Sequence, residues 1–278
     1  MSKVDYEVEY DNRARVPEHP AIFARWEKDA AAYRDETSRA GRAELGLSYG
    51  PSERQIIDLF KPERDNGAIA LFIHGGYWHA LQPSTFSHIA RGLNAHGVTV
   101  GVAGYDLCPK VSVADIIGQM RAATLHLWTR FGKRVFVYGH SAGGHLAGAM
   151  LATDWTKFDS SAPSDLVLAA YSVSGVFDLT PLLGISINND LRLDEKQARA
   201  VSPVFWPAPA ERVLDSLVGG IESSEFIRQA QIIVEAWKAK TKTRFEVVPG
   251  VSHFTVVDPL SDPHSAMTAR TLELCGRS

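Results

Sequence analysis

The sequence predicts an α/β protein with a mostly parallel central sheet and helices on both faces. Three observations lead to this prediction. Segments typical of strands alternate with segments typical of helices along most of the chain. Several predicted strands are continuous apolar runs, as expected for strands that are covered on both faces. The apolar run 135–138 also breaks at Gly139 directly before helix-forming residues, which indicates a sharp strand-to-helix turn.

The composition indicates an ordinary globular protein. The 278 residues are 45% hydrophobic and 22% charged, with a formal net charge of -3. This balance predicts no basic surface for nucleic acid, and no apolar run is long enough to cross a membrane. The first residues lack the apolar core of a signal peptide, and Cys108 and Cys275 predict neither a disulfide framework nor a zinc cluster. We therefore expect a cytoplasmic protein without nucleic-acid or membrane partners. The sequence leaves open whether the protein forms a homodimer.

The N-terminal part, about residues 1–52, is expected to form a helical arm. Apolar side chains recur at helical spacing through residues 17–36, which predicts an amphipathic helix that covers the core. These side chains are Ile22, Phe23, Trp26, Ala30 and Tyr33. Residues 39–52 are polar and contain glycines, so they are expected to form a loop.

The remaining elements follow from hydrophobic patterns and from helix-end signals. Ser84 is expected to cap one helix, and Gly97 and Gly132 are expected to end two helices. Residues 179–210 interrupt the alternation and are expected to form an irregular insertion near the substrate pocket. No repeat or linker is evident, so residues 1–278 are expected to form a single domain. Strands are predicted over 54–60, 68–73, 98–103, 135–138, 165–173, 212–219 and 244–248, and helices over 84–96, 112–131, 224–240 and about 263–275.

The motif Gly139-x-Ser141-x-Gly143 marks the predicted strand-to-helix turn. In a nucleophile elbow, the serine hydroxyl is exposed at the carboxyl end of a strand. The flanking residues are glycines because a β-carbon there would collide with the neighbouring strand and helix. A tightly packed helix start would use similar residues, but the strand before and the helix after favour a nucleophilic Ser141.

A second glycine motif, His74-Gly75-Gly76-Tyr77-Trp78, follows the predicted strand 68–73. Backbone N–H groups at Gly75 and Gly76 are free to face a ligand because no side chain shields them. In serine hydrolases such groups stabilise the oxyanion of the tetrahedral intermediate. A plain glycine turn is the alternative, but the position one strand–helix–strand unit before the elbow favours an oxyanion hole.

A serine nucleophile needs a base, and that base needs a third group that orients it. Only His253 and His264 lie beyond the helix of the elbow, and His253 directly follows the last predicted strand, where the base is expected. His264 is expected in the first turn of the final helix. His140 and His145 have no matching carboxylate spacing, so no metal or other cofactor is expected.

The acid is expected after the strand that precedes the base. Glu222 is the first carboxylate after Gly219 and Gly220 and precedes the next helix, so its side chain can reach across the end of the sheet. Glu225 is expected in the first turn of that helix as a solvated carboxylate. Asp215 and Asp258 are weaker alternatives.

Together these motifs resemble the kynurenine formamidases, or arylformamidases, within the esterase and lipase α/β hydrolases. The resemblance spans about residues 68–257 and implies the α/β-hydrolase fold. It also implies that Ser141 is the nucleophile, His253 the base and Glu222 the acid, with Gly75, Gly76 and Ala142 at the oxyanion. Glu222 stands where this family usually has aspartate. The motifs are those of residues 74–78, 105–109, 139–145, 174–179 and 222–226, with His253-Phe254.

The resemblance implies hydrolysis of a small acyl group from an aryl amide, with N-formylkynurenine of tryptophan catabolism as the leading substrate. A short-chain aryl carboxylesterase and a non-catalytic ligand-binding protein are the alternatives, and the complete set of Ser141, Glu222 and His253 argues against the last. No partner other than the small-molecule substrate is expected.

Four aromatic residues are expected to line the substrate pocket. Tyr77 and Trp78 follow the oxyanion glycines, so we expect them close to the acyl group, where large rings would favour formyl or acetyl. Phe205 and Trp206 lie in the insertion and are expected to stack on an aryl leaving group. Tyr77 and Trp78 would restrict nothing if they instead pointed into the core.

Overall fold

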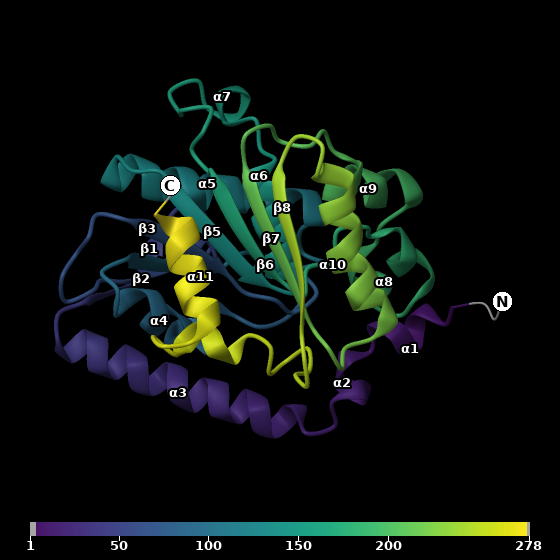
Figure 1. Ribbon diagram of the computed structural model, residues 1–278, viewed down its shortest axis with the longest axis horizontal. Helices are drawn as coiled ribbons and strands as arrows, with labels where there is room; N and C mark the ends of the chain where they lie inside the picture. Colours follow the sequence, from purple (N-terminus) through teal and green to yellow (C-terminus); the bar gives the residue numbers. More distant parts are fainter. Residues whose placement is uncertain (1–3, 277–278) are drawn as a thin grey trace.

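The computed structural model describes residues 4–276 and contains one eight-stranded sheet (Figure 1). The strand order is β1-β2-β4-β3-β5-β6-β7-β8, and β2 runs antiparallel to both of its neighbours. The pairs from β4 to β8 are all parallel, so the carboxyl ends of these strands lie at the same edge of the sheet. The strands are β1 (Ala43–Ser48), β2 (Ile56–Phe60), β3 (Ile69–Ile73), β4 (Thr99–Ala103), β5 (Val135–His140), β6 (Ala169–Val173), β7 (Val213–Gly219) and β8 (Lys242–Val248).

Helices cover both faces of the sheet, as predicted (Figure 1). Because side chains alternate along a strand, each strand contributes to two apolar layers. In β3, for example, Leu71 and Ile73 belong to the apolar layer that also contains side chains of α5, α6 and α10, whereas Ala70 and Phe72 belong to the layer that contains side chains of α3, α4 and α11. These helices are α3 (His19–Arg39), α4 (Ala90–Asn94), α5 (Val113–Phe131), α6 (Ala142–Leu151), α10 (Ser224–Trp237) and α11 (Ala266–Cys275).

Shorter elements connect these layers. Two of them, α1 (Tyr6–Tyr10) and α2 (Asn12–Arg15), precede the long helix α3. The insertion at 179–210 contains several short helical turns rather than regular secondary structure of any length. The other short elements are η1 (Pro83–Ile89), α7 (Trp155–Phe158), η2 (Thr180–Gly184), α8 (Asn188–Leu191), α9 (Glu195–Ala200), η3 (Pro203–Phe205) and η4 (Asp258–Ser261).

Helix α5 shows how local sequence sets the ends of an element. Ser112 caps its N-terminus: the Ser112 Oγ accepts from the backbone N–H of Asp115 at 3.1 Å, and the Asp115 carboxylate accepts from the N–H of Ser112 at 2.9 Å. Gly132 ends the helix at φ 64°, a conformation that glycine adopts without the steric cost of a β-carbon.

Two predicted segments differ from the structure. The loop predicted over 39–52 is wrong, because residues 43–48 form the edge strand β1 against β2. Its apolar residues alternate, but the strand is half exposed, and its register shifts between Glu44 and Leu47. Glycines within and around the segment are equally typical of a loop, so this short alternation is easily overlooked. The helix predicted over 84–96 begins as the 3-10 turn η1, and its N-cap is Gln82 rather than Ser84 because Pro83 occupies the first helical position.

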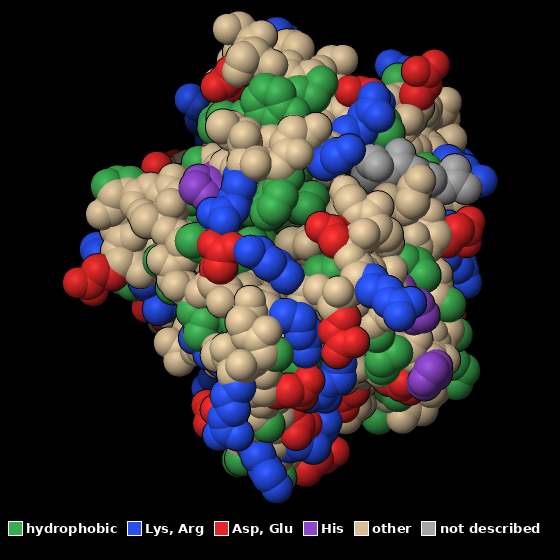
Figure 2. All heavy atoms as spheres, turned by 90° about the vertical axis from the view of Figure 1, so that its left-hand side faces the viewer, with side chains coloured by type: hydrophobic (Ala, Val, Ile, Leu, Met, Phe, Trp, Pro, Cys, Tyr) green, Lys and Arg blue, Asp and Glu red, His purple; other side chains and the backbone are tan. Residues whose placement is uncertain are grey.

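Charged side chains of both signs are interspersed on the face shown in Figure 2, where no large area of one sign is visible. This agrees with the small net charge of -3. Within residues 4–276, no helix has the length and apolar character needed to span a bilayer.

Candidate active site

The elbow lies at the junction of β5 and α6. Ser141 has φ 57° and ψ -120°, a backbone conformation that L-residues rarely adopt. A β-carbon at Gly143 would lie 1.9 Å from the carbonyl oxygen of Ile73, and one at Gly139 would lie 2.3 Å from that of Gly143. Only glycine at these two positions lets α6 start this close to β3 and β5, and this packing holds Ser141 at the carboxyl edge of the sheet.

Three side chains from separate loops at this edge form a chain of hydrogen bonds. Nδ1 of His253 lies 2.6 Å from Oε2 of Glu222, and Nε2 of His253 lies 3.1 Å from Oγ of Ser141. A carboxylate only accepts, so Nδ1 carries a proton, and Nε2 of the neutral ring is then available to accept the serine proton. The exposed fractions are 3% for Ser141, 3% for His253 and 6% for Glu222. The arrangement can activate a serine hydroxyl for acyl transfer.

Two further donors hold the Glu222 carboxylate, both on Oε1. The Ser174 hydroxyl donates at 2.5 Å and the backbone N–H of Gly219 donates at 2.6 Å. Ser174 is fully buried at the end of β6 and has φ 52°, which is strained for a residue other than glycine. Oε2 is therefore left to face His253. Ser174 opens the motif at residues 174–179, but nothing in its local sequence predicts that its hydroxyl faces Glu222.

The imidazole of His253 is also held by its neighbours. Nε2 of His140, the residue before Ser141, donates to the backbone carbonyl of His253 at 2.7 Å. Burial, together with the nearby His253, keeps the pKa of His140 well below its ordinary value, so this ring is neutral. The ring of Phe226 lies 4.5 Å from that of His253, measured between centroids. These contacts fix the loop after β8 against the elbow.

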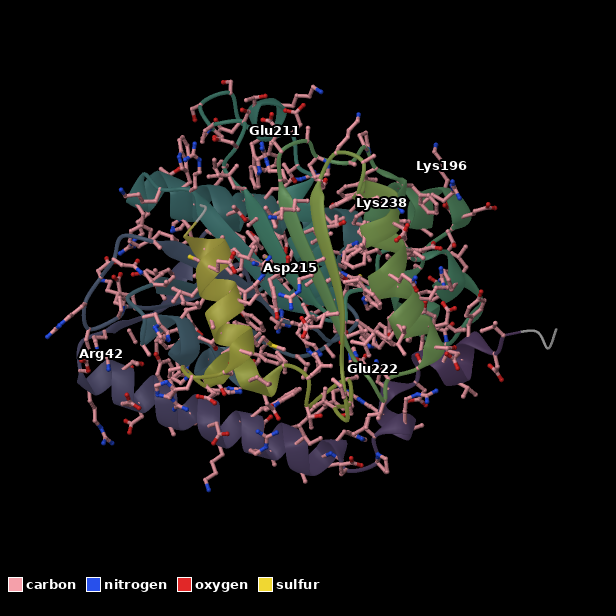
Figure 3. The ribbon with its side chains drawn as sticks, viewed as in Figure 1. Arg42, Lys196, Glu211, Asp215, Glu222 and Lys238 are labelled. Carbon is pink, nitrogen blue, oxygen red and sulfur yellow. The ribbon has the colours of Figure 1, made fainter. Side chains whose placement is uncertain are left out.

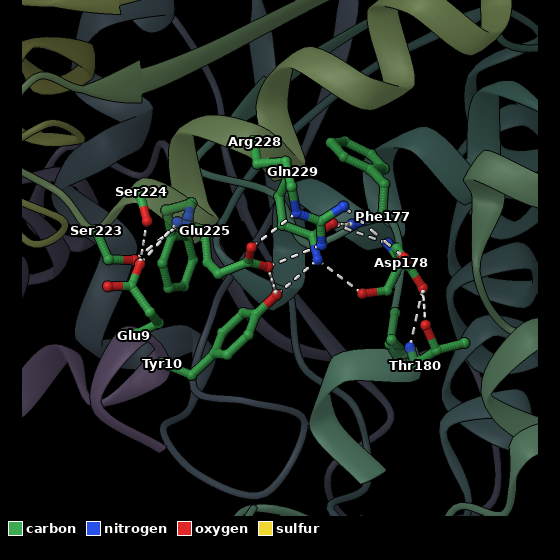
Figure 4. Close-up of polar contacts among 12 residues, drawn as sticks. Glu9, Tyr10, Phe177, Asp178, Thr180, Ser223, Ser224, Glu225, Arg228 and Gln229 are labelled. Carbon is green, nitrogen blue, oxygen red and sulfur yellow. Dashed lines mark hydrogen bonds and ion pairs between the residues drawn. The ribbon is translucent and has the colours of Figure 1, made fainter. Parts of the chain in front are cut away.

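The other carboxylates that were considered as the acid are engaged elsewhere. Glu225 accepts from Tyr10 at 3.0 Å and pairs with Arg228 at 2.8 Å (Figure 4). Asp215 lies within β7, away from Glu222, and pairs with an arginine of α11 at 2.6 Å (Figure 3). Asp258 accepts from the Trp26 indole at 2.8 Å. None of these contacts involves His253, and among residues 4–276 Glu222 is the carboxylate whose hydrogen bond orients this ring.

The predicted oxyanion residues surround Ser141. A β-carbon at Gly75 would lie 2.9 Å from Cβ of Ser141, and Gly76 lines the same cavity as Ser141. Gly76 has φ 104°, where a side chain would be strained. Ala142 is the first residue of α6, and backbone N–H groups in a first helical turn have no partner within their helix. The arrangement suits an anion next to the Ser141 hydroxyl.

A cavity of about 290 Å³ opens at Ser141 and His253. Part of its wall is aromatic: Phe23 and Trp26 are stacked with centroids 5.2 Å apart, and Phe254 meets Phe23 edge-on at 5.0 Å. The cavity is lined by Glu7, Tyr10, Asp11, Asn12, Arg13, Phe23, Trp26, Gly76, Tyr77, His79, Ala80, Leu81, His140, Ser141, Ser186, Ile187, His253 and Phe254.

Of the four aromatic residues predicted to line the pocket, the structure brings only Tyr77 to this cavity. Trp78 is fully buried and meets His145 of α6 edge-on at 5.0 Å, because the backbone turns at Tyr77 and Trp78 with φ 47° and 57°. Phe205 lies under Arg199 at 4.0 Å, and the Trp206 indole donates to the carbonyl of Ala200 at 2.9 Å. These three side chains do not line the cavity.

Residues of the N-terminal arm line the cavity instead, although the sequence predicts only a core-covering role for this arm. Polar contacts attach the arm to α10, the helix that follows Glu222 (Figure 4). The Glu9 carboxylate accepts from Ser224 Oγ at 2.7 Å and from the Glu225 N–H at 2.9 Å. The amide of Gln229 donates to the Tyr10 hydroxyl at 2.7 Å. No local pattern in residues 5–16 predicts these contacts, which join segments about 215 residues apart.

The structure offers no evident metal centre. Among residues 4–276, no three His, Cys, Asp or Glu side chains are grouped so that they could hold a metal ion.

Comparisons with known proteins agree with the fold described above. A model of the family described as "alpha/beta hydrolase fold" matches residues 70–256. The chain is 28% identical to the kynurenine formamidase of Danio rerio, with 100% of this chain and 98% of that protein covered. It is 30% identical to the kynurenine formamidase of Salmo salar, with 89% and 88% covered.

A crystal structure from Silicibacter sp. TM1040, described as that of a candidate thioesterase, has a TM-score of 0.86 and 34% identity. The similarity covers 96% of this chain and 98% of that one. The family match covers more than half of the chain, and the relatives match over nearly their full length. The chain therefore belongs to the α/β-hydrolase family, as a member related to the kynurenine formamidases.

Proposed function

We propose that this α/β hydrolase removes a formyl group from an N-formyl arylamine, with N-formylkynurenine as the leading substrate. The observation that carries the proposal is the hydrogen-bonded chain from Ser141 through His253 to Glu222, which opens into a cavity with an aromatic wall. The aromatic wall suits an aryl leaving group, because ring–ring contacts add about 0.5–1.5 kcal/mol beyond burial. The similarity to two kynurenine formamidases supports the choice of substrate.

The first half-reaction forms an acyl-serine. Oγ of Ser141 attacks the formyl carbon while Nε2 of His253 takes its proton, and Glu222 stabilises the resulting imidazolium. Backbone N–H groups at Gly76 and Ala142 would donate to the negatively charged oxygen of the tetrahedral intermediate. Nε2 of His253 then gives the proton to the aniline nitrogen as the carbon–nitrogen bond breaks. The arylamine leaves and the formyl group stays on Ser141.

The second half-reaction uses water. Nε2 of His253 takes a proton from the water molecule as its oxygen attacks the formyl carbon, and a second tetrahedral intermediate forms. Its collapse breaks the bond to Oγ of Ser141, which regains a proton from His253. The products are formate and the unchanged enzyme.

A short-chain aryl esterase is the second candidate. The same three residues would serve an ester, whose leaving group needs less protonation than an amine does. The structural relative described as a candidate thioesterase supports this alternative, because a thioester is likewise cleaved without an amine leaving group.

The decisive experiment is a kinetic panel that pairs each aryl formamide with its acetamide and with the matching aryl esters. We expect the largest kcat/KM among the amides for N-formylkynurenine, and falling values as the acyl chain grows beyond acetyl. Esters that outrun every formamide, with values flat or rising up to hexanoyl, would favour the esterase.

Ser141→Ala is the control for the covalent step. We expect kcat to fall by ~10⁴-fold or more with the fold retained, because the remaining groups cannot replace the nucleophile. A fluorophosphonate should label the unsubstituted protein at Ser141 and should not label the variant. If the unsubstituted protein is folded but is neither labelled nor active, it is instead a non-catalytic binding protein.

A further inference from the structure

We propose that Asn12 and Arg13, at the start of α2, form a subsite for the zwitterionic α-amino acid group of the substrate's aryl portion. In this subsite, Oδ1 of Asn12 accepts a hydrogen bond from the ammonium group, and the guanidinium of Arg13 pairs with the carboxylate. The inference rests on the proposed function for the identity of the arylamine. It assigns a recognition role to a segment that lies outside the triad and outside the oxyanion loop.

The orientation of the Asn12 amide follows from its neighbours. The Tyr77 hydroxyl uses its one proton to donate to the backbone carbonyl of Tyr10 at 2.7 Å. It can therefore only accept from Asn12, whose Nδ2 lies 3.3 Å away. The amide must then present its oxygen elsewhere, and Oδ1 has no hydrogen-bond partner among the described residues.

An acceptor in this state is costly. Asn12 is only 4% exposed and lines the active-site cavity. A buried carbonyl oxygen without a donor destabilises the unliganded protein, and a ligand that brings an N–H group removes this penalty. An ammonium group is the strongest such donor, because its hydrogen bonds are charge-assisted.

Arg13 is the cation on the same wall. It lines the cavity, and no carboxylate within residues 4–276 pairs with it. Arg15, two residues later, lies outside this cavity and pairs with Glu9 at 3.7 Å. A guanidinium presents parallel N–H donors that match a carboxylate, so Arg13 is suited to the acidic half of an amino acid.

The charge of the surrounding wall favours a zwitterion over a simple anion. Glu7 and Asp11 line the cavity together with Arg13. Glu7 accepts from the backbone N–H of Ser186 at 2.7 Å and also from its hydroxyl, which attaches α1 to the insertion. One oxygen of Asp11 accepts from Ala14 N–H at 2.9 Å. Because two carboxylates share this wall with Arg13, a ligand with a positive group beside its carboxylate matches the wall best.

The test measures binding rather than turnover, so it stands apart from the proposed function. Four ligands share one aryl ketone: L-kynurenine, kynuramine, which lacks the carboxylate, 4-(2-aminophenyl)-4-oxobutanoate, which lacks the α-ammonium, and 2-aminoacetophenone, which lacks both. Their Kd values are measured by calorimetry with the full-length protein. We expect L-kynurenine to bind roughly 10-fold or more tightly than 2-aminoacetophenone, a difference typical of one or two charge-assisted contacts.

Two variants separate the two halves of the subsite. Arg13→Gln should weaken the two carboxylate-bearing ligands about 10-fold and leave kynuramine unchanged. Asn12→Leu should weaken the two ammonium-bearing ligands. Because Asn12→Leu also removes the contact to Tyr77, Tyr77→Phe removes that contact alone and should keep the preference for ammonium. Arg15→Gln is the matched control and should change no Kd.

Three results would overturn the assignment. L-kynurenine could bind no better than 2-aminoacetophenone, Arg13→Gln could weaken all four ligands equally, or the preference for L-kynurenine could survive both substitutions. Arg13 is exposed, so its substitution is not expected to prevent folding, and far-ultraviolet circular dichroism checks this. If binding shows the expected pattern but N-formylkynurenine is not cleaved, the proposed function fails and the subsite stands.

Discussion

At the residue scale, the two oxygens of Glu222 have separate tasks. Oε1 accepts from Ser174 and from the Gly219 N–H, and Oε2 faces Nδ1 of His253. Two donors on one oxygen fix the plane of the carboxylate, so the other oxygen meets the imidazole in one orientation.

Exchanging this carboxylate for an amide should separate orientation from folding. Glu222→Gln should lower kcat by roughly 10⁴-fold, because the amide favours the wrong imidazole tautomer, as in the triad precedent. Glu225→Gln is the matched control: it should reduce stability through its contacts with Tyr10 and Arg228 but leave kcat within a few-fold. Steady-state kinetics and urea unfolding of both variants measure this. The reverse ranking of kcat would mean that the acid is misassigned.

Ser174 is predicted to act as a positioning residue. Ser174→Ala should lower kcat by about 10-fold, the value of one charge-assisted hydrogen bond, with little change in KM because Ser174 does not line the cavity. Ser174→Gly removes the same hydroxyl but relieves the strain at φ 52°, so it should be about 1 kcal/mol more stable than the alanine variant at equal kcat. Variants with unchanged kcat would show that the hydroxyl only fills space.

At the scale of elements, the contact between α6 and β3 sets the position of the nucleophile. The N-terminus of α6 reaches the carbonyl of Ile73 so closely that only glycine fits at position 143. The same chain contains a glycine in α5, Gly118, whose added β-carbon would meet nothing within 4 Å. The two positions therefore allow the backbone preference of glycine to be separated from its packing.

Alanine at these two positions should have opposite effects. Gly118→Ala should stabilise the protein by about 0.5–1 kcal/mol, because alanine loses less conformational freedom in a helix. Gly143→Ala should lower the free energy of unfolding by several times that amount and abolish turnover, because the new β-carbon would lie 1.9 Å from a backbone oxygen. The test compares the denaturant midpoints of unfolding of the two variants. Equal midpoints would contradict the close packing of the elbow.

At the scale of the whole molecule, buried neutral histidines link stability to pH. Burial lowers the pKa of His74 to about 3 and the pKa values of His88 and His145 to about 4. In the unfolded chain these groups titrate near 6.5. Between about pH 6.5 and 4 the unfolded state therefore binds more protons than the folded state, and the free energy of unfolding falls as the pH falls.

One of these histidines can be tested alone. The imidazole of His145 donates to the carbonyl of Val201 at 2.7 Å, a contact that glutamine can also make. In His145→Gln, unfolding should bind about one proton fewer at pH 5 than in the unsubstituted protein. When the pH falls from 7 to 5, the free energy of unfolding of the variant should therefore fall by ~2 kcal/mol less. Urea unfolding at pH 7, 6 and 5 measures both slopes. Parallel slopes would mean that His145 is not held neutral.

Much of this molecule was predictable from sequence because its signals are local. Continuous apolar strands, helix caps and the glycine pattern of the elbow each lie within a few residues, and they predict the parallel sheet that the structure confirms. Parallel strands end at one edge, so Ser141, Glu222 and His253 could be placed together from chain order alone. The similarity to kynurenine formamidases was likewise evident from motifs and is confirmed by the comparisons.

Only the tertiary structure decided what surrounds those residues. The cavity wall comes from the N-terminal arm, attached through contacts such as that of Tyr10 with Glu225, 215 residues away in the chain. Ser174 meets the Glu222 carboxylate, which lies 48 residues later in the chain. Trp78 is directed into the core by the turn of the backbone at Tyr77 and Trp78, and its ring packs there against His145 of α6. Contacts of this range leave no periodicity or local motif, so they exist only once the sheet brings the segments together.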